Sequence, residues 1–353
     1  MRPLCLPIAG LSALLLAACG AWAEPPAAAE PLLMEPPLSV SIEEASADAM
    51  LFGDPVAMAA GEPSAIEEAP GAPPVVPSPL PMQTYEGYGG TTFVPLAYLL
   101  NPGPAGELFG MPSASYSFTK AGDKDLHIWA LSITLLRRVE VSWAINRVGL
   151  GDWPDKVRVL TAGFRSAGRD HLYMHNINLR GLLIEEADAM PAVTGGAHFK
   201  IGQGVHSIDH RMGGGARRVG FEKESGVDFT LTASKTCPNL VFGRPLIATA
   251  GLRWSKGSQI GWTGFGSGYR TSWEGSLICM VTDQLATGYE YRMKRSAYTH
   301  NRGLYASEDD WHSIFAAYAI DEHMKVRGQW MYAGELGRGI QACVWGIQFQ
   351  YDF

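Results

Sequence analysis

The sequence predicts an all-β fold: an antiparallel transmembrane β-barrel of about 12 strands, preceded by a disordered N-terminal segment. Three observations predict it. Apolar and polar residues alternate with a period of two in many segments of residues 112–353. The chain ends on an aromatic residue, Phe353, that closes such a segment. It begins with a short apolar stretch that is typical of an export signal.

Composition excludes several other classes. The chain has 353 residues, of which 46% are hydrophobic and 18% charged, with a net charge of −7. The charged fraction lies below the roughly 25% of ordinary soluble domains. There is no basic excess, so nucleic acid is not an expected partner. Beyond residue 23, no apolar run reaches the roughly 18 residues that a membrane-spanning helix needs.

Residues 1–23 are interpreted as a signal peptide. Arg2 supplies a positive start, residues 11–18 are apolar, and Ala21-Trp22-Ala23 has the small-x-small pattern of a cleavage site. An alternative is a lipobox over residues 16–20, in which Cys19 is lipidated. Both interpretations predict that the chain leaves the cytoplasm of a bacterium. The other cysteines after this region are three and widely spaced, so neither a disulfide framework nor a zinc site is expected.

The next 61 residues, 24–84, are predicted to form a disordered arm. They hold 13 of the 23 prolines and ten acidic residues, with no Lys or Arg. Such a composition buries too little apolar surface to offset the entropy of ordering. A periplasmic tether that docks a partner is the functional alternative. Residues 85–111 are expected to be a lead-in to the barrel or a plug within it.

The last predicted strand, 343–353, shows the alternation most clearly. One face carries Cys343, Trp345, Ile347, Phe349, Tyr351 and Phe353, and the other carries Val344, Gly346, Gln348, Gln350 and Asp352. Eleven alternating residues are enough to cross a bilayer as a tilted strand. The terminal Phe353 is typical of the signal that outer-membrane assembly machinery reads. We therefore expect that machinery and outer-membrane lipid as partners, and the bacterial outer membrane as the location.

Twelve strands are predicted over residues 112–353. Their spans are 112–119, 125–136, 138–147, 172–185, 190–202, 226–237, 244–256, 268–281, 283–294, 309–319, 323–334 and 343–353. An even number places both ends of the barrel in the periplasm. A soluble sandwich would also alternate, but the strand lengths and the many Trp and Tyr residues on the apolar faces favour a barrel in lipid. In lipid the sheet must close, since an open edge leaves backbone groups unpaired.

Several motifs resemble a known family. They are Ser225-Gly226-Val227-Asp228-Phe229-Thr230-Leu231-Thr232-Ala233-Ser234-Lys235, Gly243-Arg244-Pro245-Leu246, Gly288-Tyr289-Glu290-Tyr291-Arg292 and Glu308-Asp309-Asp310-Trp311. Their order and spacing resemble the DUF3034 family of bacterial outer-membrane-type β-barrel proteins of unknown function, over roughly residues 110–353. The resemblance implies a fold and a location, and it supplies no catalytic residue.

The polar faces of the predicted strands form a set of lumen-lining residues. They are Glu140, Arg180, His198, Lys200, Asp228, Arg253, Arg270, Glu274, Glu290, Arg292, Lys325 and Arg327. One interpretation is a network of paired charges that fills a narrow lumen. The other is the selectivity lining of a small pore. Cations outnumber acids in this set, so a pore would favour small polar or anionic solutes.

The motif His206-Ser207-Ile208-Asp209-His210 invites a hydrolase hypothesis, because Ser, His and Asp can form an activated nucleophile. A metal site and a solvated polar loop are the alternatives. No helix is expected after Gly213-Gly214-Gly215, and we expect no catalytic residue, metal or cofactor. The predicted function is a porin-like pore or transporter for small solutes. The alternatives are a structural or adhesive envelope protein and an outer-membrane lipase or esterase.

Overall fold

A computed structural model describes residues 78–298, 308–334 and 343–353. The predicted signal peptide, the lipidation candidate Cys19 and residues 24–77 of the arm lie outside the described residues. Within them, the predicted 12-strand antiparallel barrel is confirmed. The strands are β3 (Ser113–Ala121), β4 (Lys124–Leu135), β5 (Val139–Gly149), β6 (His171–Ile184), β7 (Ala192–Gln203), β8 (Ser225–Val241), β9 (Arg244–Gly257), β10 (Phe265–Met280), β11 (Leu285–Arg292), β12 (Trp311–Ala319), β13 (Met324–Tyr332) and β14 (Cys343–Asp352).

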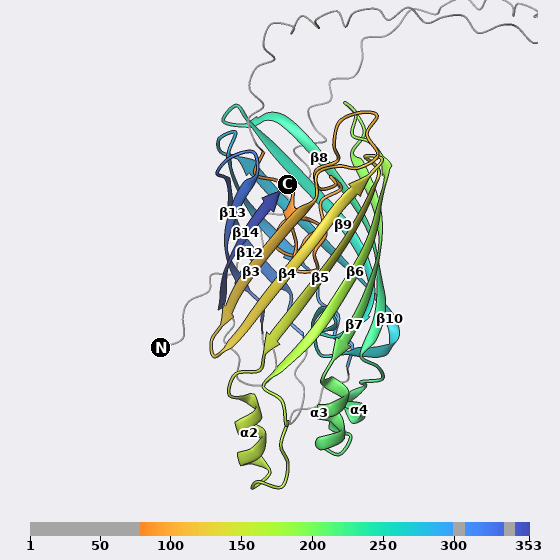
Figure 1. Cartoon of the computed structure of the whole chain (residues 1–353), viewed down its shortest axis with the longest axis vertical. Helices are drawn as coiled ribbons and strands as arrows, with labels where there is room; N and C mark the ends of the chain where they lie inside the picture. The colour runs from red at the N-terminus through yellow and green to blue at the C-terminus, as the bar shows by residue number, and fades with distance from the viewer. Residues whose placement is uncertain (1–77, 299–307, 335–342) are drawn as a thin grey trace, which may run out of the picture. The chain divides into compact units, whose positions relative to one another are not determined.

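The sheet closes because its first and last strands pair. β14 runs antiparallel to β3, with Asp352 opposite Ser113 and Trp345 opposite Lys120. Every other strand pairs with its neighbour in the chain, so the sheet has no free edge. Figure 1 shows the strands running obliquely around one cylinder. Each predicted span overlaps one strand, and the largest difference is β8, which runs to Val241 instead of the predicted 237.

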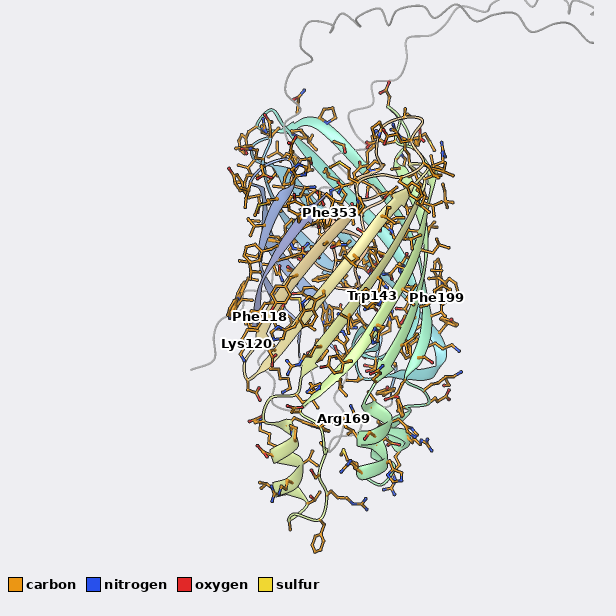
Figure 2. The ribbon with its side chains drawn as sticks, in the orientation of Figure 1. Phe118, Lys120, Trp143, Arg169, Phe199 and Phe353 are labelled. Atoms are coloured by element: carbon orange, nitrogen blue, oxygen red, sulfur yellow. The ribbon has the colours of Figure 1, made fainter. Side chains whose placement is uncertain are left out.

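Side chains alternate between the two faces of the wall as the period of two predicts. On β14, Trp345 and Phe349 are exposed on the outer face, whereas Gln348 and Asp352 are buried inside. Figure 2 shows Trp143 and Phe199 on the outside of the cylinder, and both are more than a third exposed. The wall therefore presents large apolar side chains on its outer face and encloses its polar ones, and apolar residues such as Ile128, Phe315 and Met331 also face inward and pack there.

Helices lie on the long connections. In the described part of the chain they are α2 (Trp153–Leu160), α3 (Val205–Arg211), α4 (Gly215–Val219) and the 3₁₀ turn η1 (Gln259–Gly261). Figure 1 shows α2, α3 and α4 together at one end of the barrel, called the outer end below. Among the described residues, no helix is long and apolar enough to cross a membrane.

The expectation of no helix after the glycine run was wrong, because α4 begins at Gly215. The carboxylate of Asp209 on α3 accepts hydrogen bonds from the backbone N–H groups of Ala216 and Arg217 at 2.7 and 3.2 Å. An acceptor at a helix start satisfies donors that have no partner within the helix. This acceptor comes from the preceding helix, so the local pattern of residues 213–219 does not reveal it.

A short hairpin lies apart from the wall. Its strands are β1 (Met82–Gln83) and β2 (Gly89–Gly90), and both are buried. We call residues 80–101 the inner segment. The sequence assigned residues 80–84 to the disordered arm, yet the structure buries them. Gln350, Ser132 and Gln348 of the wall form hydrogen bonds with Gln83. These contacts with distant strands order the segment, and the composition of the segment alone does not predict them.

Candidate functional site

The inner segment lies within the barrel lumen. Tyr85, Glu86, Tyr88 and Phe93 are fully buried although they belong to no barrel strand. The segment passes very close to the wall at Gly87, whose φ is +95°. A Cβ atom there would lie 2.7 Å from the Cβ of Ala144 on β5. Only glycine both adopts this positive φ readily and lacks the Cβ atom that would clash with Ala144, so a glycine at position 87 allows the segment to pass here.

Six buried charged residues form the central ion cluster. It joins Glu86 of the inner segment to residues of five wall strands, namely Lys200, Asp228, Arg253, Glu274 and Arg292. Lys200 Nζ lies 2.5 Å from a Glu86 oxygen and 2.7 Å from an Asp228 oxygen. Arg292 lies 3.1 Å from Glu86 and 2.6 Å from Glu274. Arg253 completes the cluster with distances of 3.2–3.4 Å to all three acids.

The central ion cluster is neutral only when the inner segment is in place. The wall supplies three cations but two acids, Asp228 and Glu274, and Glu86 is the third acid. All six side chains are at most 4% exposed. A buried charge without a partner is strongly unfavourable, because the surroundings cannot solvate it as water does. Glu86 therefore ties the inner segment to the wall electrostatically.

A second tie comes from Glu290 on β11. Its carboxylate accepts hydrogen bonds from the Thr91 hydroxyl at 2.7 Å and from the backbone N–H groups of Thr92, Phe93 and Val94 at 3.0–3.2 Å. Such a charge-assisted cluster is stronger than bonds between neutral groups. One wall carboxylate thus holds a whole turn of the inner segment.

Glu140 and Arg180 form a third tie on β5 and β6. Their side chains pair at 3.3 Å. Each also binds the inner segment backbone: Glu140 accepts from the N–H groups of Gly89 and Leu100, and Arg180 donates to the carbonyls of Gly89 and Leu96. The Leu96 carbonyl and the Leu100 N–H lie outside the β1–β2 hairpin, so for them these side chains take the role that a neighbouring strand has elsewhere.

The inner segment is also bound toward the end opposite the helices. The backbone N–H of Gln83 donates to Gln350, and its side chain donates to Ser132. The Tyr98 hydroxyl donates to Glu186 in the β6–β7 turn at 2.5 Å. Burial raises the pKa of Glu186, but hydrogen bonds from Tyr98 and from the backbone of Thr236 outweigh it and hold the pKa below its ordinary value. Glu186 thus holds the end of the segment as a carboxylate.

The structure gathers nearly all the predicted lumen residues. Eleven of the twelve are buried inside, and they are Glu140, Arg180, His198, Lys200, Asp228, Arg253, Glu274, Glu290, Arg292, Lys325 and Arg327. Arg270 is partly exposed and donates to the Gly268 carbonyl. His198 lies against the Tyr88 ring with centroids 4.6 Å apart, and Lys325 pairs with Asp352 at 2.8 Å.

Sequence reasoning missed Glu86, which lies in a region without periodicity. The imbalance between cations and acids in the predicted lumen set is the signal that could have indicated it. The predicted lumen set holds seven cations and four acids, so a closed lumen needs additional carboxylates from elsewhere. Glu86 and Asp352 are two of them in the structure.

Little space remains beside the central ion cluster. The cavity there, which Arg253, Arg270 and Arg292 help to line, has a volume of about 30 Å³. This is about the volume of one water molecule in the liquid. The middle of the lumen is therefore filled by the inner segment and the charged side chains that bind it.

The motif at residues 206–210 lies in α3 at the outer end. The Asp209 carboxylate binds the start of α4, as described above, and it lies 3.4 Å from Arg217. His206 and His210 are exposed. These contacts give the acid a structural role in joining two helices. Across the described ranges, no group of three or more His, Cys, Asp or Glu side chains is arranged to hold a metal ion.

Comparisons with known proteins identify a family. The model of the family described as "Protein of unknown function (DUF3034)" matches residues 81–344, so the chain belongs to this family. The match includes residues 81–101 of the inner segment, which lie outside the resemblance over residues 110–353. No curated protein matches the chain.

Similar solved structures include the KdgM porin, with 10% identity, 68% of this chain and 99% of that chain covered, and a TM-score of 0.42. The COG4313 outer membrane channel from Pseudomonas putida F1 has 12% identity, coverages of 71% and 96%, and a TM-score of 0.36. Outer membrane phospholipase A from Escherichia coli has 8% identity, coverages of 72% and 98%, and a TM-score of 0.33.

Proposed function

We propose that this member of the DUF3034 family is an outer-membrane channel for small polar or anionic solutes, closed at rest by its own inner segment. The apolar outer face supports the membrane location. Trp129, Leu179, Phe229 and Trp330 are each exposed by more than 40% on different strands. A closed sheet with such an outer face suits the hydrocarbon core of a bilayer. There, every backbone polar group must be paired within the protein, and the side chains that face lipid must be apolar.

The single observation that carries the proposal is the burial of Glu86 among Lys200, Arg253 and Arg292. The acid that neutralises the lumen does not belong to the wall, so the wall and the inner segment are complementary but separate parts. Around the cluster the contacts between them are polar, whereas Phe93 and Leu96 of the inner segment pack among apolar wall residues such as Trp311 and Phe315. Withdrawal must separate both kinds of contact, and water that enters the lumen then solvates the charges that remain. Because the inner segment belongs to no wall strand, it can leave the lumen without opening the sheet.

The charge of the wall predicts the preference of the open channel. The barrel strands contribute six buried cations and five buried acids among the described residues. These are Arg180, Lys200, Arg253, Arg292, Lys325 and Arg327, and Glu140, Asp228, Glu274, Glu290 and Asp352. Withdrawal of Glu86 leaves one positive charge in excess, and Arg270 adds another toward the outer end. A lumen with excess positive charge attracts anions.

Conductance across planar lipid bilayers tests the proposal. We expect the purified wild-type protein to show rare channel events and a variant lacking residues 80–101 to show frequent ones. In a salt gradient, the reversal potential of the variant should indicate anion preference. Glu86→Gln should also raise the frequency of openings, whereas Glu107→Gln, at an exposed position of the lead-in, should leave it unchanged.

Two results would overturn the proposal. If the folded deletion variant and Glu86→Gln are as silent as the wild type, the barrel is a structural envelope protein whose lumen stays filled. If the open channel prefers cations, the assignment of anionic solutes is wrong. Far-ultraviolet circular dichroism of each variant establishes that the barrel has formed before conductance is measured.

A further inference from the structure

The Glu86 carboxylate is bound by wall groups that stay in the barrel when the inner segment leaves. One carboxylate oxygen lies 2.5 Å from Lys200 Nζ and 3.3 Å from Arg253 Nη1. The other oxygen lies 3.1 Å from Arg292 Nη1. Three cations on β7, β9 and β11 thus surround one planar group with two oxygens, and in the closed barrel the inner segment supplies that group.

Wall acids hold these cations in position without the inner segment. An Asp228 oxygen lies 2.7 Å from Lys200 Nζ and 3.4 Å from Arg253 Nη1. Glu274 oxygens lie 3.2 Å from Arg253 Nη2 and 2.6 Å from Arg292 Nε. A site whose groups are already in place binds a ligand at a lower entropic cost. Three cations against two acids leave one positive charge, which one monoanion neutralises.

A hydroxyl group accompanies the carboxylate. The Tyr88 hydroxyl donates to a Glu86 oxygen at 2.7 Å and accepts from Arg253 Nη2 at 2.7 Å. Tyr88 also belongs to the inner segment, so Arg253 loses both partners when the segment leaves. In a small hydroxycarboxylate, a hydroxyl on the carbon next to the carboxylate lies within hydrogen-bonding distance of a carboxylate oxygen. Such a molecule presents the two groups that the inner segment presents.

The cavity of about 30 Å³ adjoins this site. Its lining in the described part of the chain holds one acid, Asp228, and five cations, which are Arg253, Arg270, Arg292, Lys294 and Arg295. Excess positive charge at a narrow opening attracts anions. The cavity is too small for a whole organic acid, so a solute reaches the three cations only as the inner segment withdraws.

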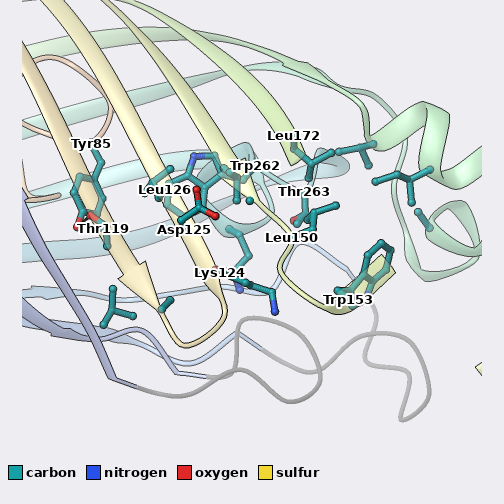
Figure 3. A pocket seen from close by; sticks show the side chains of 18 of the residues that line it. Tyr85, Thr119, Lys124, Asp125, Leu126, Leu150, Trp153, Leu172, Trp262 and Thr263 are labelled. Carbon is teal, nitrogen blue, oxygen red and sulfur yellow. Dashed lines mark hydrogen bonds between the residues drawn. The ribbon is translucent and has the colours of Figure 1, made fainter. Parts of the chain in front are cut away.

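The larger cavity at the outer end is of a different kind. Its volume is about 250 Å³, and Figure 3 shows Leu126, Leu172 and Trp262 among the side chains around it. A mainly apolar lining does not offset the cost of removing a carboxylate from water. A charged solute is therefore expected at the central ion cluster and not in this cavity.

We propose that Lys200, Arg253 and Arg292 form the solute-binding site of the channel and that its ligand is a small hydroxycarboxylate with one negative charge. This inference rests on the proposed function, since the inner segment occupies the site in the closed barrel. The solute carboxylate takes the place of Glu86, and the solute hydroxyl takes the place of Tyr88 on Arg253. Because the solute and the inner segment compete for one site, the solute favours the open barrel.

A variant of the full-length protein tests the site without any measurement of current. Glu86→Ala removes the atoms of one acetate ion and leaves the rest of the inner segment in place. Saturating acetate should raise the midpoint temperature of its thermal unfolding in detergent micelles by roughly 3 °C over chloride at equal ionic strength. The wild type and Glu107→Ala, changed at an exposed residue, should show no such rise. Equal midpoints of Glu86→Ala in acetate and chloride would overturn the proposal.

Openings of the wild-type protein in planar bilayers test the solute class. A ligand that binds only the open state raises the population of that state. We expect lactate to raise the open probability roughly tenfold over chloride, and propionate, which lacks the hydroxyl, roughly twofold. Equal effects of lactate and propionate would contradict the role of the hydroxyl, and no effect of either would contradict the site.

The two proposals fail in different ways. If Glu86→Gln conducts but neither acetate nor lactate has any effect, the channel stands and the hydroxycarboxylate site is wrong. If acetate stabilises Glu86→Ala but every variant is silent in the bilayer, the carboxylate site stands and the channel is wrong.

Discussion

The barrel wall and the inner segment reach full burial by opposite means. In the wall, backbone groups pair mainly with the neighbouring strand, and the side chains need only alternate between lipid and lumen. The inner segment has two short strands and a few internal turns, and other backbone groups of it bind side chains of the wall such as Glu140 and Glu290. The wall is therefore specified by a repeating pattern, and the inner segment by individual partners. Substitutions should affect the two regions in different ways.

Replacement of Glu86 by Gln should have the largest effect. It leaves three buried cations of the central ion cluster with two acids, and breaking a buried ion pair costs about 3–5 kcal/mol. Guanidinium unfolding in detergent micelles measures the loss. Glu107→Gln makes the same chemical change at an exposed residue and should change the free energy of unfolding by less than about 0.5 kcal/mol. Equal stabilities of the two variants would mean that the cluster does not hold the segment.

An arginine on the lipid face should come next. Leu131 lies near the middle of β4 and is 51% exposed. Leu131→Arg should destabilise the barrel in lipid by about 2–4 kcal/mol, since the guanidinium must be placed in hydrocarbon. Leu183→Arg, near the end of β6, should cost about 0–1 kcal/mol. If refolding in liposomes shows no difference between the two positions, the outer face does not lie in a bilayer.

Glu290→Gln should produce a smaller and local effect. One Glu290 oxygen accepts from the Thr91 hydroxyl and from the N–H groups of residues 93 and 94, and the other accepts from the Thr92 N–H. An amide keeps only one acceptor oxygen, so it loses one of these two sets of bonds. We expect a loss of about 1–3 kcal/mol and faster hydrogen exchange at the amides of residues 92–94. Glu185→Gln, on an exposed turn, is the control. Unchanged exchange would show that other contacts hold this turn.

The contact between Tyr98 and Glu186 should give the smallest effect, and it should depend on pH. The pKa of Glu186 is lowered from its ordinary value of 4.5. A carboxylate with a lowered pKa stabilises the folded state above that ordinary value, and this contribution is lost as the pH falls through the folded pKa. Between about pH 6 and pH 3, the wild type should lose up to about 1 kcal/mol more stability than Glu186→Gln. Parallel pH profiles of the two proteins would contradict this.

The sequence predicts much more of the barrel wall than of the inner segment. Alternation along β14 predicted both of its faces, because a period of two is a property of the strand itself. The predicted lumen set followed from the same rule, and only Arg270 lies partly in solvent. Glu86 could not be assigned a partner in this way. It contacts Arg292, which is 206 residues away, and nothing near Glu86 in the chain indicates which strands surround it.

The sequence by itself determined the barrel, its strand number and the alternation of side chains between the two faces of the wall, but not that Trp311 and Phe315 point inward. These three features depend on local alternation and on the need of a sheet in lipid to close. Only the tertiary structure decided that residues 80–101 fill the lumen and that Glu86 balances three wall cations. Such contacts join residues far apart in the chain, and closure of the cylinder is what brings them within hydrogen-bonding distance of one another.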